Sequence, residues 1–289
     1  MRLFLMITTA GSQFYTEHAL RSFFEHTLLC DDDAFYLVDN DSSYILPSNL
    51  AGSPITLQRN KSPLGFAENV NQFIRIAQAR RADLILLNND VIFTPSWLEL
   101  LEGDNPNAIT APICNLDIAN TTPHRWHGIL QLQDYFGHET ELIAMASEYA
   151  TQGSAPLSVL VLGFFVARIP YSVLLTVGLF DENFGRAGGE DFDYCLRAHL
   201  AGFPVRTIMK SFLLHFGGKS SWDGVEENVE RTKRESNFQE YFKNKWGLGL
   251  YRLIFERDQT IAPPGSPLDQ AFRSGNYKTA IEVLHVPKK

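Results

Sequence analysis

The sequence has few cysteines and no excess of positive charge. Its 289 residues include three cysteines, Cys30, Cys114 and Cys195, and none belongs to a C-x-x-C pair. An odd number of widely spaced cysteines fits neither a disulfide scaffold nor a zinc site, and it is typical of a reducing compartment. The net charge of −8 argues against a protein that coats nucleic acid, so we expect no nucleic-acid partner.

Long hydrophobic runs are absent as well. The longest uncharged stretch, residues 149–167, contains Gln152 and Pro156 and is a poor transmembrane span. The first apolar run, residues 3–7, is shorter than the core of a signal peptide. We therefore expect a cytoplasmic protein with no transmembrane segment. Peripheral contact with the inner face of the membrane stays open.

The composition is that of a folded globular protein. Hydrophobic residues make up 45% and charged residues 20% of the chain, which excludes a disordered or fibrous protein. A chain of this length holds one large domain or two small ones. It can also bury a full core without disulfides or a structural metal.

The first half of the chain alternates short apolar runs with helical patterns. Continuous apolar runs of this length suit strands that are buried on both faces. Helical patterns lie between them, at residues 14–28, 66–77 and 97–101. This alternation predicts an α/β fold with a mostly parallel central sheet flanked by helices. The apolar runs cover residues 3–9, 35–38, 55–57, 84–87 and 108–113.

The second half is less regular. Residues 115–156 are rich in Asn, Thr, His, Gln and Gly and show no clean period, so we expect an irregular insertion or a lid region. Apolar runs then cover residues 157–169, 205–209 and 212–216, and helical patterns cover residues 170–177, 190–201 and 225–246.

Three parts follow from these patterns. Residues 1–222 form the α/β domain, and residues 223–262 form a charged helical extension. Residues 263–289 contain a proline-rich linker and a C-terminal helical hairpin with a Gly-Asn turn.

Polar residues follow two of the predicted strands directly. Asp39 follows the run that ends at Val38, and Asn88 and Asp90 follow the run that ends at Leu87. The carboxyl ends of strands in an open α/β sheet face the ligand crevice. Asp39 can accept hydrogen bonds from a base or ribose there, and Asp90 offers the hard oxygen ligand that Mg²⁺ or Mn²⁺ prefers. Simple polar turns after strands are the alternative interpretation.

Two further motifs carry chemistry. In GGEDFDYCLR, residues 188–197, the carboxylates Glu190, Asp191 and Asp193 begin a helix behind two glycines. An acidic helix cap would explain the charges alone, but the glycines favour an active-site loop. In LHFGGKSS, His215 follows an apolar run, and the segment lacks the spacing of a Walker A loop.

Taken together, five segments resemble family 2 glycosyltransferases, in particular their rhamnosyltransferase-like branch. They occur in the expected order within roughly residues 2–220. The resemblance implies a GT-A nucleotide-diphospho-sugar transferase fold, followed here by a helical C-terminal segment. The segments are VDNDSSY, NKSPLGFAENVNQFIRIA, DLILLNNDVIFTPSWLE, GFFVARIPYSVLLTVGLFDENFGRAGGEDFDYCLRAHLAGFPV and LHFGGKS.

The resemblance implies a donor nucleotide site. Asp39 would bind the base or ribose of a nucleotide sugar. Thr8 and Thr9, at the end of the first strand, would help to line that pocket. Gly65 and Asn71 belong to the segment that flanks the nucleotide.

The resemblance also implies metal-binding and catalytic residues. Asn88 and Asp90 take the place of the D-x-D motif, with Asn88 on the donor and Asp90 on the metal and diphosphate. His215 takes the place of a further metal or diphosphate ligand. Asp191 takes the place of the catalytic base, and Glu190 would help to hold the acceptor. Segment 115–156 falls where acceptor-binding insertions would lie.

The implied activity is inverting, metal-dependent hexosyl or deoxyhexosyl transfer, in glycan or polysaccharide biosynthesis. The donor would be a UDP-, dTDP- or GDP-linked sugar, the cofactor Mn²⁺ or Mg²⁺, and the acceptor a glycan, a lipid-linked glycan or a protein. A nucleotidyltransferase is one alternative, but its first loop is usually basic and glycine-rich, whereas this chain has GSQFYTEH. A non-catalytic nucleotide-sugar-binding or scaffold relative is another, and Asp90, Asp191 and His215 count against it.

Overall fold

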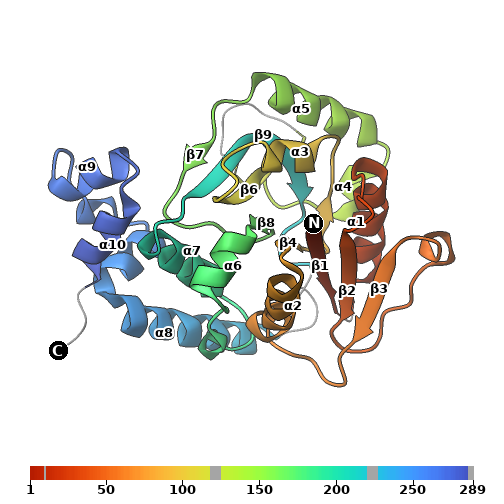
Figure 1. Cartoon of the computed structure of the whole chain (residues 1–289), viewed down its shortest axis with the longest axis horizontal. Helices are drawn as coiled ribbons and strands as arrows, with labels where there is room; N and C mark the ends of the chain where they lie inside the picture. The colour runs from red at the N-terminus through yellow and green to blue at the C-terminus, as the bar shows by residue number, and fades with distance from the viewer. Residues whose placement is uncertain (10, 118–124, 220–226, 286–289) are drawn as a thin grey trace.

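The structure is a computed structural model that describes residues 1–9, 11–117, 125–219 and 227–285. One mixed sheet forms its centre, and helices cover both faces of that sheet (Figure 1). The strand order across the sheet is β3-β2-β1-β4-β8-β6-β9-β5, and β7 pairs with β9.

The first half of the sheet is parallel throughout. Each of its strands is one of the predicted apolar runs, and a strand covered on both faces needs apolar side chains on both. The sheet and helix arrangement predicted from that alternation is confirmed. These strands are β1 (Arg2–Thr8), β2 (Ala34–Asp39), β3 (Ile55–Arg59) and β4 (Asp83–Leu87).

The second half of the sheet mixes directions. Strand β8 (Val166–Ile169) runs antiparallel between β4 and β6 (Ile109–Cys114), while β6 pairs parallel with β9 (Val205–His215). The sequence indicates two separate runs over 205–216, but a register shift in β6 lets residues 209–211 bulge, so that β9 continues as one strand. Two short strands, β5 (Val91–Ile92) and β7 (Leu157–Ser158), pair antiparallel with β9.

Alternate residues of β1 point to opposite faces of the sheet and are buried in different layers of the core. Leu3 and Leu5 belong to the core beneath α2, whereas Phe4 and Met6 belong to the core beneath α1. The first layer contains α2 (Phe66–Arg80), α6 (Tyr171–Val177) and α7 (Glu190–Leu200). The second contains α1 (Gln13–His26) and α3 (Trp97–Glu102).

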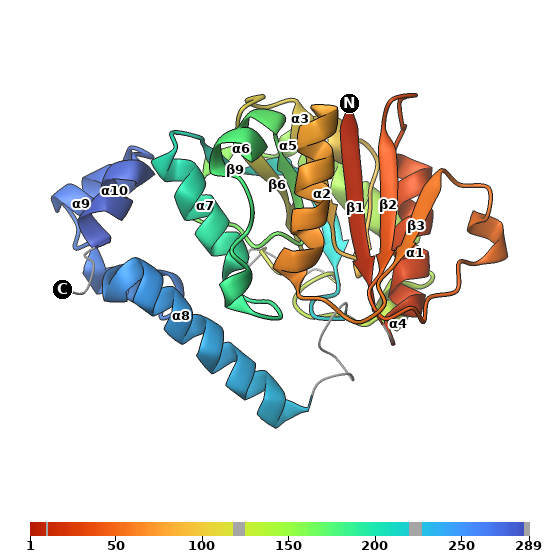
Figure 2. The ribbon, with the colours of Figure 1, turned by 60° about the horizontal axis from the view of Figure 1, so that its bottom comes forward.

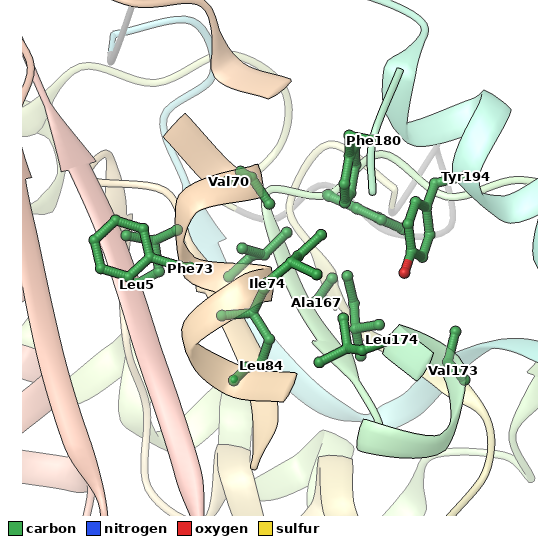
Figure 3. Packing of buried hydrophobic residues seen from close by; sticks show 14 of the residues in the cluster. Leu5, Val70, Phe73, Ile74, Leu84, Ala167, Val173, Leu174, Phe180 and Tyr194 are labelled. Atoms are coloured by element: carbon green, nitrogen blue, oxygen red, sulfur yellow. The ribbon is translucent and has the colours of Figure 1, made fainter. Parts of the chain in front are cut away.

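Figure 3 shows how the first layer packs. Val70, Phe73 and Ile74 of α2 face the sheet, where Leu5 and Leu84 lie. All five side chains are almost completely buried. Burial of each stabilises the fold by about 1.5–3 kcal/mol, so this layer fixes α2, and with it the strand ends, in place.

The segment 115–156 differs from the prediction of an irregular insertion. Helix α5 (Glu139–Gln152) follows the short helix α4 (Leu132–Tyr135) there, so the prediction is wrong over these residues. Only Leu142, Met145 and Ala146 of α5 are buried, because the helix touches the domain along one narrow stripe. Such a stripe is hard to detect in a polar sequence. Residues 118–124 lie outside the described residues.

The C-terminal region wraps along the outside of α7 (Figure 2). Helix α8 (Asn228–Ile254) extends past the predicted end at residue 246, because Gly247 adopts a φ of 86° and allows a kink. Helices α9 (Pro267–Arg273) and α10 (Tyr277–Leu284) form the predicted hairpin, and α10 buries Ile281 against the cluster formed with α7 and α8. The predicted boundary between residues 222 and 223 lies outside the described residues, as do residues 286–289.

None of the helices in the described part of the chain combines the length and the apolar character needed to cross a membrane.

Candidate active site

A pocket of about 530 Å³ opens at the carboxyl ends of the parallel strands. Thr9 follows β1, Asn40 follows β2 and Asn88 follows β4, and all three line the pocket. The opposite wall comes from the loop before α7 and from the first turns of α8. A concave site at this edge of the sheet is where an open α/β fold binds its ligand.

Asp90 and His215 form a pair beside this pocket, in which His215 lines the pocket and Asp90 lies buried behind it. The Nε2 atom of His215 lies 3.3 Å from Oδ1 of Asp90, and the Asp90 side chain is completely buried. The second carboxylate oxygen accepts the Lys219 amide at 2.9 Å. Burial opposes the charged form, but the His215 charge and the hydrogen bonds outweigh it and hold the pKa of Asp90 below its usual value.

The free atoms of this pair fit a divalent cation. Among the described residues, neither Oδ1 of Asp90 nor Nε2 of His215 has a hydrogen-bond partner. A carboxylate oxygen and an imidazole nitrogen that face each other can ligate one ion such as Mn²⁺. Within the described ranges, no three His, Cys, Asp or Glu side chains converge on one point. Among the described residues, Asp90 and His215 are therefore the two candidate ligands at this point.

Two consecutive residues connect this pair to the predicted base. The ring of Phe165 stacks on the imidazole of His215, with centroids 4.8 Å apart. The amide of Phe164 donates to Oδ2 of Asp191 at 3.3 Å. The amide of Asn88 donates to the Phe165 carbonyl at 2.7 Å. The segment before β8 therefore holds both groups against the end of β4.

Glu190 and Asp191 begin α7 and both line the pocket. Oδ1 of Asp191 accepts the Phe192 amide at 2.8 Å, and Glu190 accepts the Gly188 amide. Burial raises the pKa of Asp191, and burial together with the charge of Asp191 raises the pKa of Glu190. Two adjacent carboxyl groups with raised pKa values are typical of an acid–base site.

Asp193 lies outside this pocket and has a structural setting. It is completely buried, and its carboxylate contacts Arg197 at 2.8 Å and Lys245 at 2.6 Å. The indole of Trp246 also donates to it at 2.9 Å. Asp193 therefore ties α7 to α8, as expected of a residue that anchors the helix rather than one that meets a substrate.

Asp39 and Thr8, both predicted at the nucleotide, are completely buried. The carboxylate of Asp39 accepts the amides of Ser43 and Tyr44 and pairs with Arg59. Thr8 belongs to a buried cluster of polar side chains and bonds the hydroxyl of Thr16 at 2.7 Å. Both shape the floor behind Thr9 and Asn40, and their contact with a donor remains a prediction.

Gly65 and Asn71 contact the segment that precedes α7. A Cβ atom at Gly65 would lie 2.8 Å from the carbonyl oxygen of Gly185, so glycine permits this close approach. The side chain of Asn71 exchanges hydrogen bonds with the backbone of Phe180 and donates to Glu182 at 2.7 Å. Neither residue lines the pocket, and their proximity to a nucleotide also remains a prediction.

One wall of the pocket is formed by residues that the sequence patterns do not single out. Arg231, Arg234 and Phe238 of α8 line it, together with Arg186 of the loop before α7. Their spacing of three and four residues does mark one helix face. The sequence does not specify the surface against which that helix face packs, so the spacing alone does not assign these residues to the pocket.

No protein-family model matches this chain, and no curated protein sequence does. Among solved structures, GalNAc-T7 with UDP, GalNAc and Mn²⁺ has a TM-score of 0.60 at 14% identity over 98% of this chain. The chain spans only 55% of the GalNAc-T7 chain.

Two microbial structures are similar at the same level. The mannosyltransferase PcManGT from Pyrobaculum calidifontis, with GDP-Man and Mn²⁺, has a TM-score of 0.52 at 13% identity over 98% of this chain and 73% of its own. Residues 1–349 of S. aureus TarS have a TM-score of 0.51 at 12% identity over 98% of this chain and 90% of their own. These likenesses establish the fold, and they confirm that this chain has the GT-A glycosyltransferase fold.

Proposed function

We propose that this chain is a metal-dependent glycosyltransferase that moves a hexosyl or deoxyhexosyl group from a nucleoside diphosphate to an acceptor hydroxyl. One observation carries the proposal: His215, which is paired with the buried Asp90, and the carboxylate of Asp191 line one pocket and are joined through Phe164 and Phe165. The fold supports it, since similar structures contain UDP or GDP-mannose together with Mn²⁺.

Asp90 and His215 would hold a divalent cation at the donor side of the pocket. Bound there, the ion would act as a Lewis acid that neutralises the diphosphate leaving group. Asn88 and Thr9 line the same side and offer polar groups to the donor. Phe164 and Phe165 also line the pocket and add apolar surface beside these polar groups.

Asp191 would act as the base. The acceptor oxygen forms a bond to the anomeric carbon while the bond from that carbon to the diphosphate oxygen breaks, and the hydroxyl proton passes to a carboxylate oxygen of Asp191. A single displacement of this kind inverts the anomeric centre. Glu190 remains protonated at neutral pH because its pKa is raised, so its carboxyl group can donate a hydrogen bond to the acceptor.

Calorimetry of UDP, GDP and dTDP with and without Mn²⁺ tests the donor side of this proposal. We expect one of these nucleotides to bind more tightly when Mn²⁺ is present, and Asp90→Ala to lose that difference. Asp104→Ala is a matched control, because Asp104 is paired with Arg206 away from the pocket. If no nucleotide binds under either condition, the proposal is wrong.

A further inference from the structure

We infer that the acceptor carries an anionic group, a phosphate or a carboxylate, and that Arg231 and Arg234 of α8 bind this group together with Arg186. This inference rests on the proposed transferase function and names the class of its acceptor. The three arginines line the pocket wall that faces the strand ends.

The position of α8 places these side chains beside the loop that precedes α7, residues 185–189. Nη1 of Arg234 donates to the carbonyl oxygen of Ala187 at 3.0 Å. One turn further along the same helix face, the ring of Phe238 covers Gly188, where a Cβ atom would lie 2.4 Å from the ring. Glycine at residue 188 therefore lets α8 approach the loop that leads into Glu190 and Asp191.

The arginines lie on the acceptor side of the pocket. A base must meet the acceptor hydroxyl, so groups next to Asp191 on α7 and its preceding loop meet the rest of the acceptor. The charge of Arg234 acts on Glu190, the residue adjacent to Asp191. The donor diphosphate would instead meet the cation that Asp90 and His215 would hold, and these two residues lie just after β4 and at the end of β9.

The net negative charge of the protein bears on the role of these arginines. A net charge of −8 repels anionic substrates at long range, so an anionic acceptor needs cationic groups at the site itself. Guanidinium groups bind phosphate and carboxylate oxygens through paired hydrogen bonds.

The ion pair at Arg231 does not prevent this. Its Nε lies 2.9 Å from Oε1 of Glu235, and the two side chains are 59% and 40% exposed. Exposed pairs of this kind are weak, so exchange of Glu235 for a ligand oxygen costs little.

The test uses the full chain saturated with whichever of UDP, GDP or dTDP binds, in Mg²⁺. Glucose 6-phosphate, glucuronate and unmodified glucose are then titrated as probes. We expect at least one of the two anionic probes to bind more tightly than glucose, and their order to distinguish phosphate from carboxylate. Arg231→Gln and Arg234→Lys should each weaken that binding, and Arg231→Gln combined with Arg234→Gln should weaken it by about 10-fold to 100-fold.

Lys233→Gln is the matched control, because it removes the same charge from α8 at a residue outside this pocket. Equal binding of glucose and both anionic probes would overturn the inference, and so would arginine variants that bind like the control. If the anionic probes bind the nucleotide-free chain but not the nucleotide-saturated chain, the arginines bind the donor diphosphate and the inference is also wrong. In these cases nucleotide binding still stands, whereas absence of nucleotide binding refutes the proposed function itself.

Discussion

The ring of Phe165 stacks on the imidazole of His215, with centroids 4.8 Å apart and the ring planes 13° apart. The neighbouring amide, that of Phe164, is bonded to Asp191. Two adjacent residues thus orient a proposed metal ligand and the proposed base. The distance between the two functions is therefore set by one short piece of backbone before β8.

Phe165→Leu should weaken metal binding without unfolding the chain. The leucine cannot stack, so the imidazole of His215 gains rotational freedom. Loss of an orienting partner behind a metal ligand costs about 10-fold to 100-fold in metal affinity. The measurement is the Mn²⁺ concentration that gives half-maximal turnover. Phe14→Leu is the control, since Phe14 is exposed, and equal Mn²⁺ requirements in both variants would count against the role of the stack.

Excess chelator should abolish turnover, and Mn²⁺ should restore it at least as well as Mg²⁺. The reason is the ligand set, because imidazole suits Mn²⁺ better than Mg²⁺. Asp90→Ala should respond to neither ion. Full turnover by the wild-type chain in excess chelator would refute a metal role for Asp90 and His215.

Asp191→Asn and Asp193→Asn should change stability in opposite directions at pH 7. Burial raises the pKa of Asp191 to about 6, so its charge destabilises the fold and asparagine should stabilise it by about 1–3 kcal/mol. Asparagine at 193 weakens the ion pairs with Arg197 and Lys245 and should cost about 1–3 kcal/mol. Urea denaturation measures the free energy of unfolding of each variant. Changes of the same sign in the two variants would contradict the environment assigned to Asp191 or to Asp193.

The pH dependence of turnover should reflect the ionisation of Asp191. A base must be ionised, so turnover should rise with pH through about 6 rather than through the ordinary value near 4. The stability difference between Asp191→Asn and the wild type should grow between pH about 4 and about 6, where the unfolded carboxyl ionises first. A turnover profile that is flat from pH 5 to 8 would be inconsistent with this assignment.

Gly188→Ala should disturb the contact between α8 and the loop that precedes α7. Residue 188 has a φ of 125°, and the added methyl group would lie 2.4 Å from the ring of Phe238. Gly178→Ala separates the two effects, because Gly178 has a φ of 80° and open space around it. We expect strain of about 1–3 kcal/mol in both variants, but a loss of turnover only in Gly188→Ala. Recovery of turnover when Phe238→Ala is added would identify the ring as the cause.

The sequence indicates the residues of the proposed donor side far better than those of the opposite wall of the pocket. Asp90 and His215 follow apolar strands, and the carboxyl ends of such strands meet at one edge, so local patterns place these residues together. The segments that mark the family resemblance likewise predict the order of the strands and of α7.

The wall formed by α8 depends on packing between distant segments. Arg234 meets Ala187 across a sequence separation of 47 residues, and nothing in the local pattern of a charged helix specifies that contact. Helix α5 was missed for a related reason, since its few buried residues give only a narrow apolar stripe. Asp39 is predicted only in part. Its position at a strand end is evident from the sequence, but its hydrogen bonds with the amides of Ser43 and Tyr44 depend on the geometry of the loop.

Release of nucleoside diphosphate from a panel of UDP-, GDP- and dTDP-linked sugars, with Mn²⁺ present, tests the central claim most directly. We predict turnover of at least one donor by the wild-type chain. Asp191→Asn should still bind that donor but lose turnover by about 10²–10⁴-fold, the usual contribution of a general base. Asp193→Asn should retain turnover per folded molecule. Absence of turnover with every donor, or a wild-type rate in Asp191→Asn, would contradict the account.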